Sequence, residues 1–402
     1  MAKVLLAWEL GGNYGHLVAL RALARELKRQ GHACTFAVRD LGSAQGFLDP
    51  ALGPLVQAPV RLTLGSNRVR RQLSYASLLH NIGFNDPVEL AGRIQGWRTL
   101  YRALGTEFVF ADHSPVALIA ARTLGIPSAC IGNGFTVPPV QSPFPSFRVG
   151  APSGATLVGA AHGRDLQRIL LANEASVLKE LNHALALLKL RPFPLLQDIF
   201  RGATPALFTY SPLDHYDVPR TEPFRGLPDY SYGARPQWPA GRGPKIFAYL
   251  APSPSLPVVL KALKQSKARV LLRLPGGTPE DAAPALRPGL SVATGPVHFR
   301  AAAESCDAFV NYGAHATVAE FLLAGKPGIL VPDLHERVLT ARRASSIGAA
   351  LSVRPTRVAP LKCALGQVID DPAPRKAAAS FAAGYGRRDR ADILPSIIRE
   401  VL

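Results

Sequence analysis

Phe309–Ala341, FVNYGAHATVAEFLLAGKPGILVPDLHERVLTA, is the stretch that decides the fold. It predicts a short apolar strand, a turn of small residues, a helix over Thr317–Gly325, a second strand and a polar turn. Gly313, Ala314 and Ala316 are small enough to let backbone N–H groups approach an anion, and the positive end of the helix dipole points to the same place. The stretch therefore predicts a phosphate-binding loop in an α/β domain.

The residues of this turn form an ordered pattern. They are Tyr312, Gly313, Ala314, His315, Ala316 and Thr317, followed by Glu320. The pattern resembles the donor-binding signature of nucleotide-sugar glycosyltransferases of the GT-B fold, which include the macrolide and plant UDP-glycosyltransferases. The resemblance implies that the turn binds the donor. In particular, it implies that Thr317 meets the diphosphate, that Glu320 holds the ribose, and that Tyr312 replaces a phosphate-contacting His.

Two flanking segments extend the resemblance to the sugar and the base of the donor. After Pro332 the family has an acid–amide pair that contacts the sugar hydroxyls, and here Glu336 and Arg337 stand in that place. Upstream, Val297 and His298 stand where relatives hold the base. This run lacks a Trp that would stack on uracil. Uridine and thymidine donors therefore both remain open.

Thr317 and Glu320 have a second interpretation. A Thr followed three residues later by a Glu forms a capping box, in which both side chains satisfy N–H groups at the start of a helix and touch no ligand. Three neighbouring features favour donor binding: the glycine turn before the pair, the helix stop at Gly325, and the acid after Pro332.

The first residues of the chain predict the opening unit of a parallel sheet. Lys3–Trp8 is an apolar strand, a glycine-rich turn follows, and Leu20, Leu23, Ala24 and Leu27 are spaced as one face of a helix. Ala33–Val38 then predicts the second strand. The turn lacks the G-x-G-x-x-G pattern, which argues against a dinucleotide cofactor.

His16 closes the run G-N-Y-G-H over Gly12–His16, at the edge of the sheet where open α/β folds bind ligands. The run resembles the family's G-x-x-G-H, whose His removes the proton of the acceptor hydroxyl. Imidazole suits this task because its unperturbed pKa lies near neutrality. Asp112 ends a buried strand, and the resemblance implies that it orients the base. Its alternative role is to cap a helix starting near Pro115. His113 is an adjacent competitor.

Length and composition predict two α/β domains. The 402 residues exceed a typical single domain. We predict an N-terminal domain over residues 1–225, a Gly- and Pro-rich linker over 226–243, and a C-terminal domain over 244–402. The resemblance implies two Rossmann-like parallel-sheet domains of the GT-B type, which face each other across a cleft. It places the acceptor in the first domain and the donor in the second. It also implies that the last helix returns to the first domain.

Several absences in the sequence narrow the class. No D-x-D motif is present, which argues against the metal-dependent GT-A type of transferase and predicts that no metal or other cofactor is needed. The four cysteines lack ligand spacing and predict reduced thiols. No signal peptide or membrane-spanning run is recognisable, so we expect a cytoplasmic protein.

The formal net charge of +18 predicts an attraction to anionic surfaces. No run of five like charges occurs, so nucleic acid is not an expected partner. Residues 61–102 hold seven Arg and two acids among aromatic residues. This region predicts one of three things: a peripheral contact with an anionic membrane or lipid-linked acceptor, a wall of an acceptor pocket, or a solvated pair of amphipathic helices.

The resemblance thus implies an inverting, metal-independent glycosyltransferase with a UDP- or dTDP-sugar donor and a small-molecule or lipid-linked acceptor. Two alternatives remain open. The departures at Tyr312 and Arg337 suit a catalytically silent homologue that acts as an auxiliary subunit, and the same fold would also suit a nucleotide-sugar epimerase. Retention of both His16 and Asp112 favours the enzyme.

Overall fold

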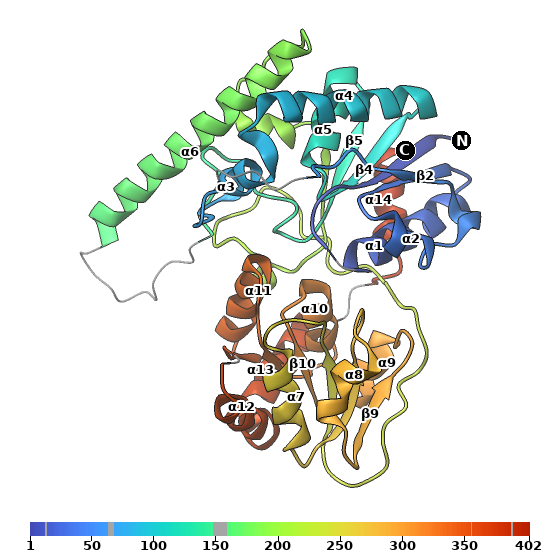
Figure 1. Ribbon diagram of the computed structural model, residues 1–402, viewed down its shortest axis with the longest axis vertical. Coiled ribbons are helices and arrows are strands. Elements are labelled where there is room, and N and C mark those ends of the chain that lie inside the picture. The colour runs from blue at the N-terminus through green and yellow to red at the C-terminus, as the bar shows by residue number, and fades with distance from the viewer. Residues whose placement is uncertain (13, 63–67, 148–158, 355, 387–388) are drawn as a thin grey trace. The chain divides into compact units, whose positions relative to one another are not determined.

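The computed structural model describes residues 1–402 except 13, 63–67, 148–158, 355 and 387–388. The described residues form two compact units (Figure 1). Unit 1 comprises Met1–Phe208, Tyr216–Pro228 and Ala391–Leu402, and unit 2 comprises Thr209–His215 and Asp229–Arg390.

Unit 1 is built on a parallel sheet, which has six strands in the described residues, in the order β3-β2-β1-β4-β5-β6. The strands are β1 (Lys3–Trp8), β2 (Ala33–Val38), β3 (Leu55–Gln57), β4 (Phe108–Asp112), β5 (Ser128–Gly132) and β6 (Thr204–Leu207). β1 and β4 lie side by side, with Trp8 opposite Asp112. Both strands are buried almost throughout, as expected for a parallel sheet covered on both faces.

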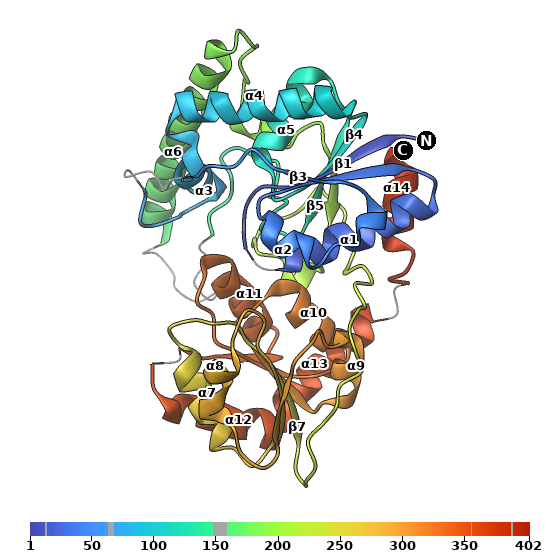
Figure 2. The ribbon, with the colours of Figure 1, turned by 45° about the vertical axis from the view of Figure 1, so that its right-hand side comes forward.

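Helices cover both faces of this sheet (Figure 2). They are α1 (Tyr14–Arg29), α2 (Leu41–Gln45), α3 (Tyr75–Leu79), α4 (Pro87–Leu104), α5 (Pro115–Leu124), α6 (Gly159–Leu187) and α14 (Ile393–Val401), with short turns at Pro50–Leu52, His80–Phe84 and Leu196–Ile199. α1 buries the apolar face that its spacing predicts. α14 joins α1 in the same core, through side chains such as Ile397 and Ile398. On the opposite face α5 packs on the sheet and α4 packs on α5.

Unit 2 repeats this plan with a second parallel sheet, in the order β12-β11-β10-β7-β8-β9. Its strands are β7 (Lys245–Tyr249), β8 (Arg269–Arg273), β9 (Leu290–Ala293), β10 (Ala308–Asn311), β11 (Gly328–Leu330) and β12 (Ala350–Ser352). Its helices are α7 (Leu256–Lys264), α8 (Pro279–Ala282), α9 (Phe299–Ser305), α10 (His315–Leu323), α11 (His335–Ser346), α12 (Val358–Asp370) and α13 (Pro372–Tyr385), with short turns at Ser211–Leu213 and Ala283–Ala285.

Counted within its own unit, each sheet has the strand order 3-2-1-4-5-6. The order reverses between the first and fourth strands, and open sheets bind ligands outside the carboxyl ends of the strands at this point. The switch point lies between β1 and β4 in unit 1, and between β7 and β10 in unit 2. A ligand-binding site is therefore expected at the carboxyl ends of these two strand pairs.

Two boundaries differ from those predicted. The apolar run 206–210 predicts one strand, but β6 ends at Leu207. Phe208 still belongs to the core of unit 1, whereas Tyr210 packs on Phe381 in unit 2, so the run continues from one core into another. Part of the Gly- and Pro-rich segment 226–243 pairs with unit 2 through a bridge between Ala234 and Val297.

Candidate active site

His16 and Asp112 meet at the switch point of unit 1. His16 lies in the first turn of α1 and Asp112 is the last residue of β4. The Nδ1 atom of His16 lies 2.9 Å from Oδ2 of Asp112. The imidazole side chain is 18 % exposed and the carboxylate 6 %. A proton on Nδ1 that is donated to the carboxylate makes Nε2 the basic nitrogen, which is the tautomer that a general base requires.

Trp8 and Gly11 fix the position of the imidazole. The indole of Trp8 stacks on His16, with ring centroids 5.4 Å apart and planes inclined by 21°. Gly11 lies next to Nε2 at the edge of the ring: it has a φ of +84°, and a Cβ atom there would lie 2.5 Å from Nε2 of His16. Gly11 is therefore required both for its backbone conformation and for the close approach of the ring.

Three hydrogen bonds hold the turn between β1 and α1. The Trp8 indole N–H donates to the Leu10 carbonyl at 2.7 Å, the Leu10 N–H donates to the His113 carbonyl at 3.1 Å, and Nη1 of Arg39 donates to the Gly11 carbonyl at 2.7 Å. Asn13 of the G-N-Y-G-H run lies outside the described residues. These bonds tie the turn to three different strand ends.

His113 is not equivalent to its neighbour Asp112. Its side chain is buried, and burial, reinforced by the nearby His16 and Arg39, lowers the pKa of His113 to about 3. The ring is therefore neutral at physiological pH. His113 also adopts a left-handed backbone conformation with a φ of +48°, which is uncommon for a residue other than Gly. Asp112 hydrogen-bonds His16, whereas His113 meets it only ring to ring, with centroids 6.1 Å apart.

The structure contradicts the alternative role of Asp112 as the N-cap residue of α5. Ser114 is the N-cap residue of α5, without a side-chain hydrogen bond, and Glu9 reaches the N–H groups of Val116 and Ala117 at 3.0 and 3.4 Å. Glu9 also lies 3.3 Å from Nη1 of Arg93. Burial of the Glu9 carboxyl, opposed by Arg93 and the two N–H groups, raises its pKa to about 7. Glu9 is not among the predicted site residues, although an acid directly after an apolar strand is a signal for one.

The turn after β10 in unit 2 is organised by Asn311. Its side-chain oxygen accepts from the N–H groups of Gly313 at 2.7 Å and Ala314 at 2.8 Å. Gly313 has a φ of +90°, and a Cβ atom there would lie 2.8 Å from the Arg337 carbonyl oxygen. The prediction that N–H groups in this turn face an anion is therefore wrong for Gly313 and Ala314, because an internal acceptor already occupies both.

The N–H groups that remain at this turn belong to α10. The helix begins at His315, two residues before the predicted Thr317, because Asn311 turns the chain earlier. Its N-cap residue is Ala314, which has no side-chain acceptor. The capping box of Thr317 and Glu320 therefore does not form. The first turn of α10 presents the N–H groups of residues 315–317 at the positive end of the helix.

Tyr312 and Arg337 are engaged with neighbouring side chains. The buried Tyr312 hydroxyl lies 2.6 Å from Oγ of Ser253, which follows β7 across the switch point. The Arg337 guanidinium lies 5.8 Å from the centre of the Tyr312 ring and donates to Asp333 at 2.7 Å. The turns after β7 and β10 are thereby connected beside the start of α10.

His315 and Glu320 also point to protein partners. Nε2 of His315 lies 2.7 Å from Oγ1 of Thr209, and burial lowers the pKa of this imidazole to about 4. Arg390 donates to both oxygens of Glu320, at 2.9 and 2.5 Å, and the Glu320 side chain is 11 % exposed. The His315 side chain is thus directed into the interior, so only its backbone remains at the turn. The Glu320 carboxylate is bound by a guanidinium.

The predicted base and sugar contacts lie at the starts of two further helices. Val297 is buried, and His298 is the N-cap residue of α9, where its Nδ1 accepts from the Ala301 N–H at 3.2 Å. Glu336 lies half-buried in the first turn of α11. All three belong to unit 2, as do Tyr312 and Glu320.

The arginine-rich region over residues 61–102 is less exposed than its sequence suggests. The side chains of Tyr75, Phe84, Trp97 and Tyr101 are at most 1 % exposed. These rings form core, and they cannot contact a membrane surface. Among the described helices, none combines the length and apolarity needed to cross a membrane.

No protein-family model matches the sequence, and no curated protein matches it. The glycosyltransferase VinC in complex with dTDP superimposes with a TM-score of 0.67 at 17 % identity, over 99 % of this chain and 98 % of that one. The calicheamicin glycosyltransferase CalG4 gives 0.68 at 18 %, over 99 % and 98 %. The spinosyn rhamnosyltransferase SpnG, complexed with spinosyn aglycone, gives 0.64 at 14 %, over 99 % and 100 %. At these identities the likeness establishes the fold, and it confirms the predicted α/β class with two Rossmann-like sheets of the GT-B type.

Proposed function

We propose that this protein is a glycosyltransferase that moves a sugar from a UDP or dTDP donor to an acceptor hydroxyl, with inversion and without a metal ion. The observation that carries the proposal is the 2.9 Å contact between His16 and Asp112 at the switch point of unit 1. The fold shared with VinC, CalG4 and SpnG supports it. A nucleotide-sugar donor and a small-molecule acceptor also agree with the dTDP bound to VinC and the aglycone bound to SpnG.

In this mechanism His16 takes the proton of the acceptor hydroxyl on Nε2 as the oxygen attacks the anomeric carbon. Asp112 stabilises the imidazolium that forms, because its carboxylate accepts the proton on Nδ1. Trp8 adds to this stabilisation, since the face of an indole ring attracts a cation held over it. Attack from the face opposite the leaving group inverts the anomeric centre.

The leaving nucleoside diphosphate gains negative charge as the sugar departs. The first turn of α10, with no side-chain acceptor at Ala314, would receive that charge on backbone N–H groups that are already oriented. Thr317 adds a hydroxyl in the same turn. Glu336 would contact the sugar, and Glu320 would hold the ribose after its exchange with Arg390.

The decisive experiment removes the base and leaves the donor site intact. We expect His16→Ala to lower turnover by roughly 10²–10⁴-fold, the usual loss for a general base, with unchanged affinity for UDP or dTDP. A donor panel read by thermal shift first identifies the nucleotide, and transfer or slow donor hydrolysis then reports turnover. His183→Ala is the matched control, because its exposed imidazole lies on α6, 4.0 Å from Glu180, and has no role in the mechanism. Turnover of His16→Ala within threefold of the native enzyme removes His16 from the mechanism.

The ion pair between Glu320 and Arg390 favours a second candidate, a nucleotide-binding homologue that transfers no sugar. A carboxylate committed to Arg390 does not hold a ribose. The two candidates separate in one assay: a silent homologue binds the nucleotide but neither transfers nor hydrolyses the donor. An altered free nucleotide sugar, formed without acceptor, would instead indicate an epimerase.

A further inference from the structure

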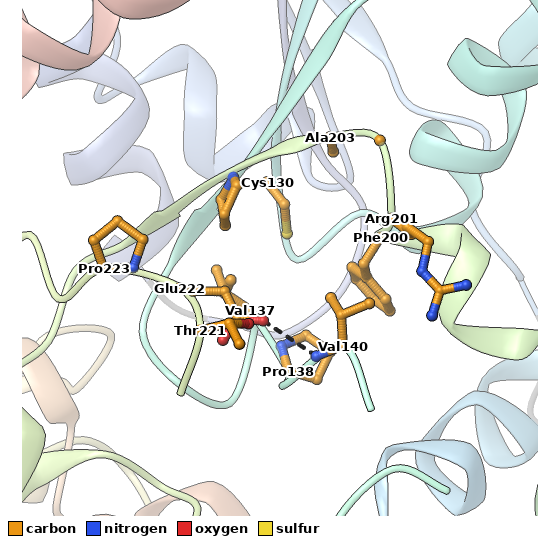
Figure 3. Close-up of a pocket in the computed structure, with 12 residues that line it drawn as sticks. Cys130, Val137, Pro138, Val140, Phe200, Arg201, Ala203, Thr221, Glu222 and Pro223 are labelled. Atoms are coloured by element: carbon orange, nitrogen blue, oxygen red, sulfur yellow. Dashed lines mark hydrogen bonds between the residues drawn. The ribbon is translucent and has the colours of Figure 1, made fainter. Parts of the chain in front are cut away.

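Unit 1 contains a cavity on the side of β5 and β6 away from α1. Cys130 of β5, Val137, Val140 and Phe200 are among the side chains that line it, and Glu222 contributes a carboxylate (Figure 3). Its volume is about 250 Å³. Small-molecule sites typically measure ~300–1,000 Å³, so this cavity suits a ligand of about one substituted ring.

The cavity reaches toward the amino edge of the sheet, away from the His16–Asp112 centre. Ala203 and Pro205, which line it, stand before and near the amino end of β6, whose last residue is Leu207. In a parallel sheet all amino ends lie at one edge and all carboxyl ends at the other. The dyad belongs to the carboxyl edge, so the cavity extends away from the reacting groups.

Glu222 makes this cavity more than an apolar gap. The residue is 6 % exposed. Its Oε1 accepts from the Val140 N–H at 3.2 Å, whereas Oε2 lies 3.5 Å from Nη1 of Arg220 and has no hydrogen-bond donor among the described residues. Arg220 is itself directed to the carbonyls of Val137 at 2.9 Å and Gly134 at 3.3 Å. A buried acceptor without a donor is costly, and a ligand that supplies the donor removes that cost.

The charges around Glu222 define the ligand further. Nη1 of Arg220 lies 3.5 Å from Oε2, so the carboxylate already faces a positive charge at the polar end of the cavity. The remaining walls are largely apolar side chains, which disfavour a charged guest. We propose that this cavity binds an uncharged, single-ring molecule whose hydroxyl donates to Oε2 of Glu222. The site is independent of sugar transfer.

Isothermal titration of the full chain tests the site with matched probes. 4-Ethylphenol carries the required hydroxyl, 4-ethyltoluene replaces it by a methyl group, and 4-ethylbenzylammonium carries a charge. We expect 4-ethylphenol to bind at least tenfold more tightly than the other two, the ratio that a hydrogen bond to a charged group gives. Glu222→Gln should remove this preference while leaving 4-ethyltoluene unchanged, because glutamine keeps an acceptor for the Val140 N–H.

Val140→Phe provides a second variant that does not touch the ion pair. Its ring fills the half-buried rim of the cavity and should abolish binding of all probes, whereas Arg201→Ser, at the exposed rim, should leave binding intact. Equal affinity for 4-ethylphenol and 4-ethyltoluene would overturn the role of Glu222. Preference for the ammonium probe would overturn the uncharged class. Binding that survives Val140→Phe, or no binding of any probe, would overturn the site.

Discussion

The helix that follows the fourth strand begins differently in the two units. In unit 1 this helix is α5, and the carboxyl of Glu9 accepts from its N–H groups at Val116 and Ala117. In unit 2 it is α10, whose N-cap residue Ala314 has no acceptor. The strand order is the same in both sheets, so topology alone does not explain the difference. In unit 1 the Glu9 side chain, from the turn after the first strand, bonds the N–H groups at the start of α5. In unit 2 the N-cap residue of α10 has no acceptor, so the start of that helix is open.

This difference agrees with the role proposed for each unit. A closed helix end does not receive an external anion, so in the proposed mechanism unit 1 acts through side chains, with His16 and Asp112 at its switch point. An open helix end receives an anion on its backbone, and unit 2 places small residues there. In unit 2 the first strand's turn contributes Ser253, a neutral hydroxyl bonded to Tyr312, where unit 1 contributes Glu9.

The largest expected effect on nucleotide affinity comes from closing α10 in the way that α5 is closed. Ala314→Asp places a carboxylate at the N-cap, where it accepts from the first turn and repels a phosphate. We expect the affinity for UDP or dTDP to fall on the order of 100-fold, and the free energy of unfolding to rise by about 1 kcal/mol. Calorimetric titration and chemical denaturation measure the two quantities.

Ala314→Asn is the matched control, since asparagine caps a helix as well as aspartate but carries no charge. It should give the same stability gain and a smaller loss of affinity. If Ala314→Asp binds the nucleotide as tightly as the native protein, the phosphates do not use the start of α10.

The Glu9 carboxyl, which closes the start of α5, should titrate. The pKa of Glu9 in the folded protein is about 7, above the value of 4.5 for an unperturbed side chain, so the native state keeps a proton that the unfolded chain releases. Its contribution to stability is complete below pH 4.5 and is lost as pH rises through 7. A shift of this size corresponds to about 3 kcal/mol.

Glu9→Gln isolates this contribution because glutamine does not titrate. The free energy of unfolding of the native protein, minus that of Glu9→Gln, should fall as pH rises from 5 to 7.5. Buried neutral imidazoles such as His113 act in the opposite direction, and the subtraction cancels them. Parallel curves would mean that Arg93 keeps Glu9 ionised throughout.

Substitutions in the Glu320–Arg390 ion pair should change nucleotide affinity by a smaller factor. The direction of that change distinguishes a ribose-binding role of Glu320 from a structural one. If the carboxylate leaves Arg390 to hold a ribose, Glu320→Gln should lower nucleotide affinity about tenfold, and Arg390→Gln should raise it by freeing the carboxylate. If the pair is only structural, both variants should lower stability and leave affinity unchanged. Titration of both proteins with the nucleotide decides between the two roles.

The sequence predicted the local parts of both units and missed the distant pairs. β1 and β2 have the predicted bounds, because continuous apolar runs of that length mark buried strands. Glu9 and Val116 are far apart in the chain, as are Glu320 and Arg390, and such contacts leave no periodic trace. The capping box failed for a related reason: Thr317 and Glu320 have the right spacing, but Asn311 starts the helix earlier.

The smallest expected effect is an association of unit 1 with anionic bilayers. Any such association would use exposed side chains. Arg68, Arg70 and Arg71 are exposed, whereas the aromatic rings of the same region, such as Trp97, are buried. The buried rings therefore provide no apolar anchor for an anionic bilayer, and the contact that these three arginines offer is electrostatic. Each basic residue near such a surface contributes ~1 kcal/mol.

Sedimentation with anionic liposomes should then show weak association at low salt and none at several hundred millimolar, where the Debye length is only a few ångström. Replacing Arg68, Arg70 and Arg71 together by Ser should abolish the low-salt association. Neutral liposomes are the control. Association that persists at high salt would require an apolar anchor, which the buried rings do not provide. Equal sedimentation with anionic and neutral liposomes would leave these arginines with no membrane role and would favour an acceptor that diffuses freely to the protein.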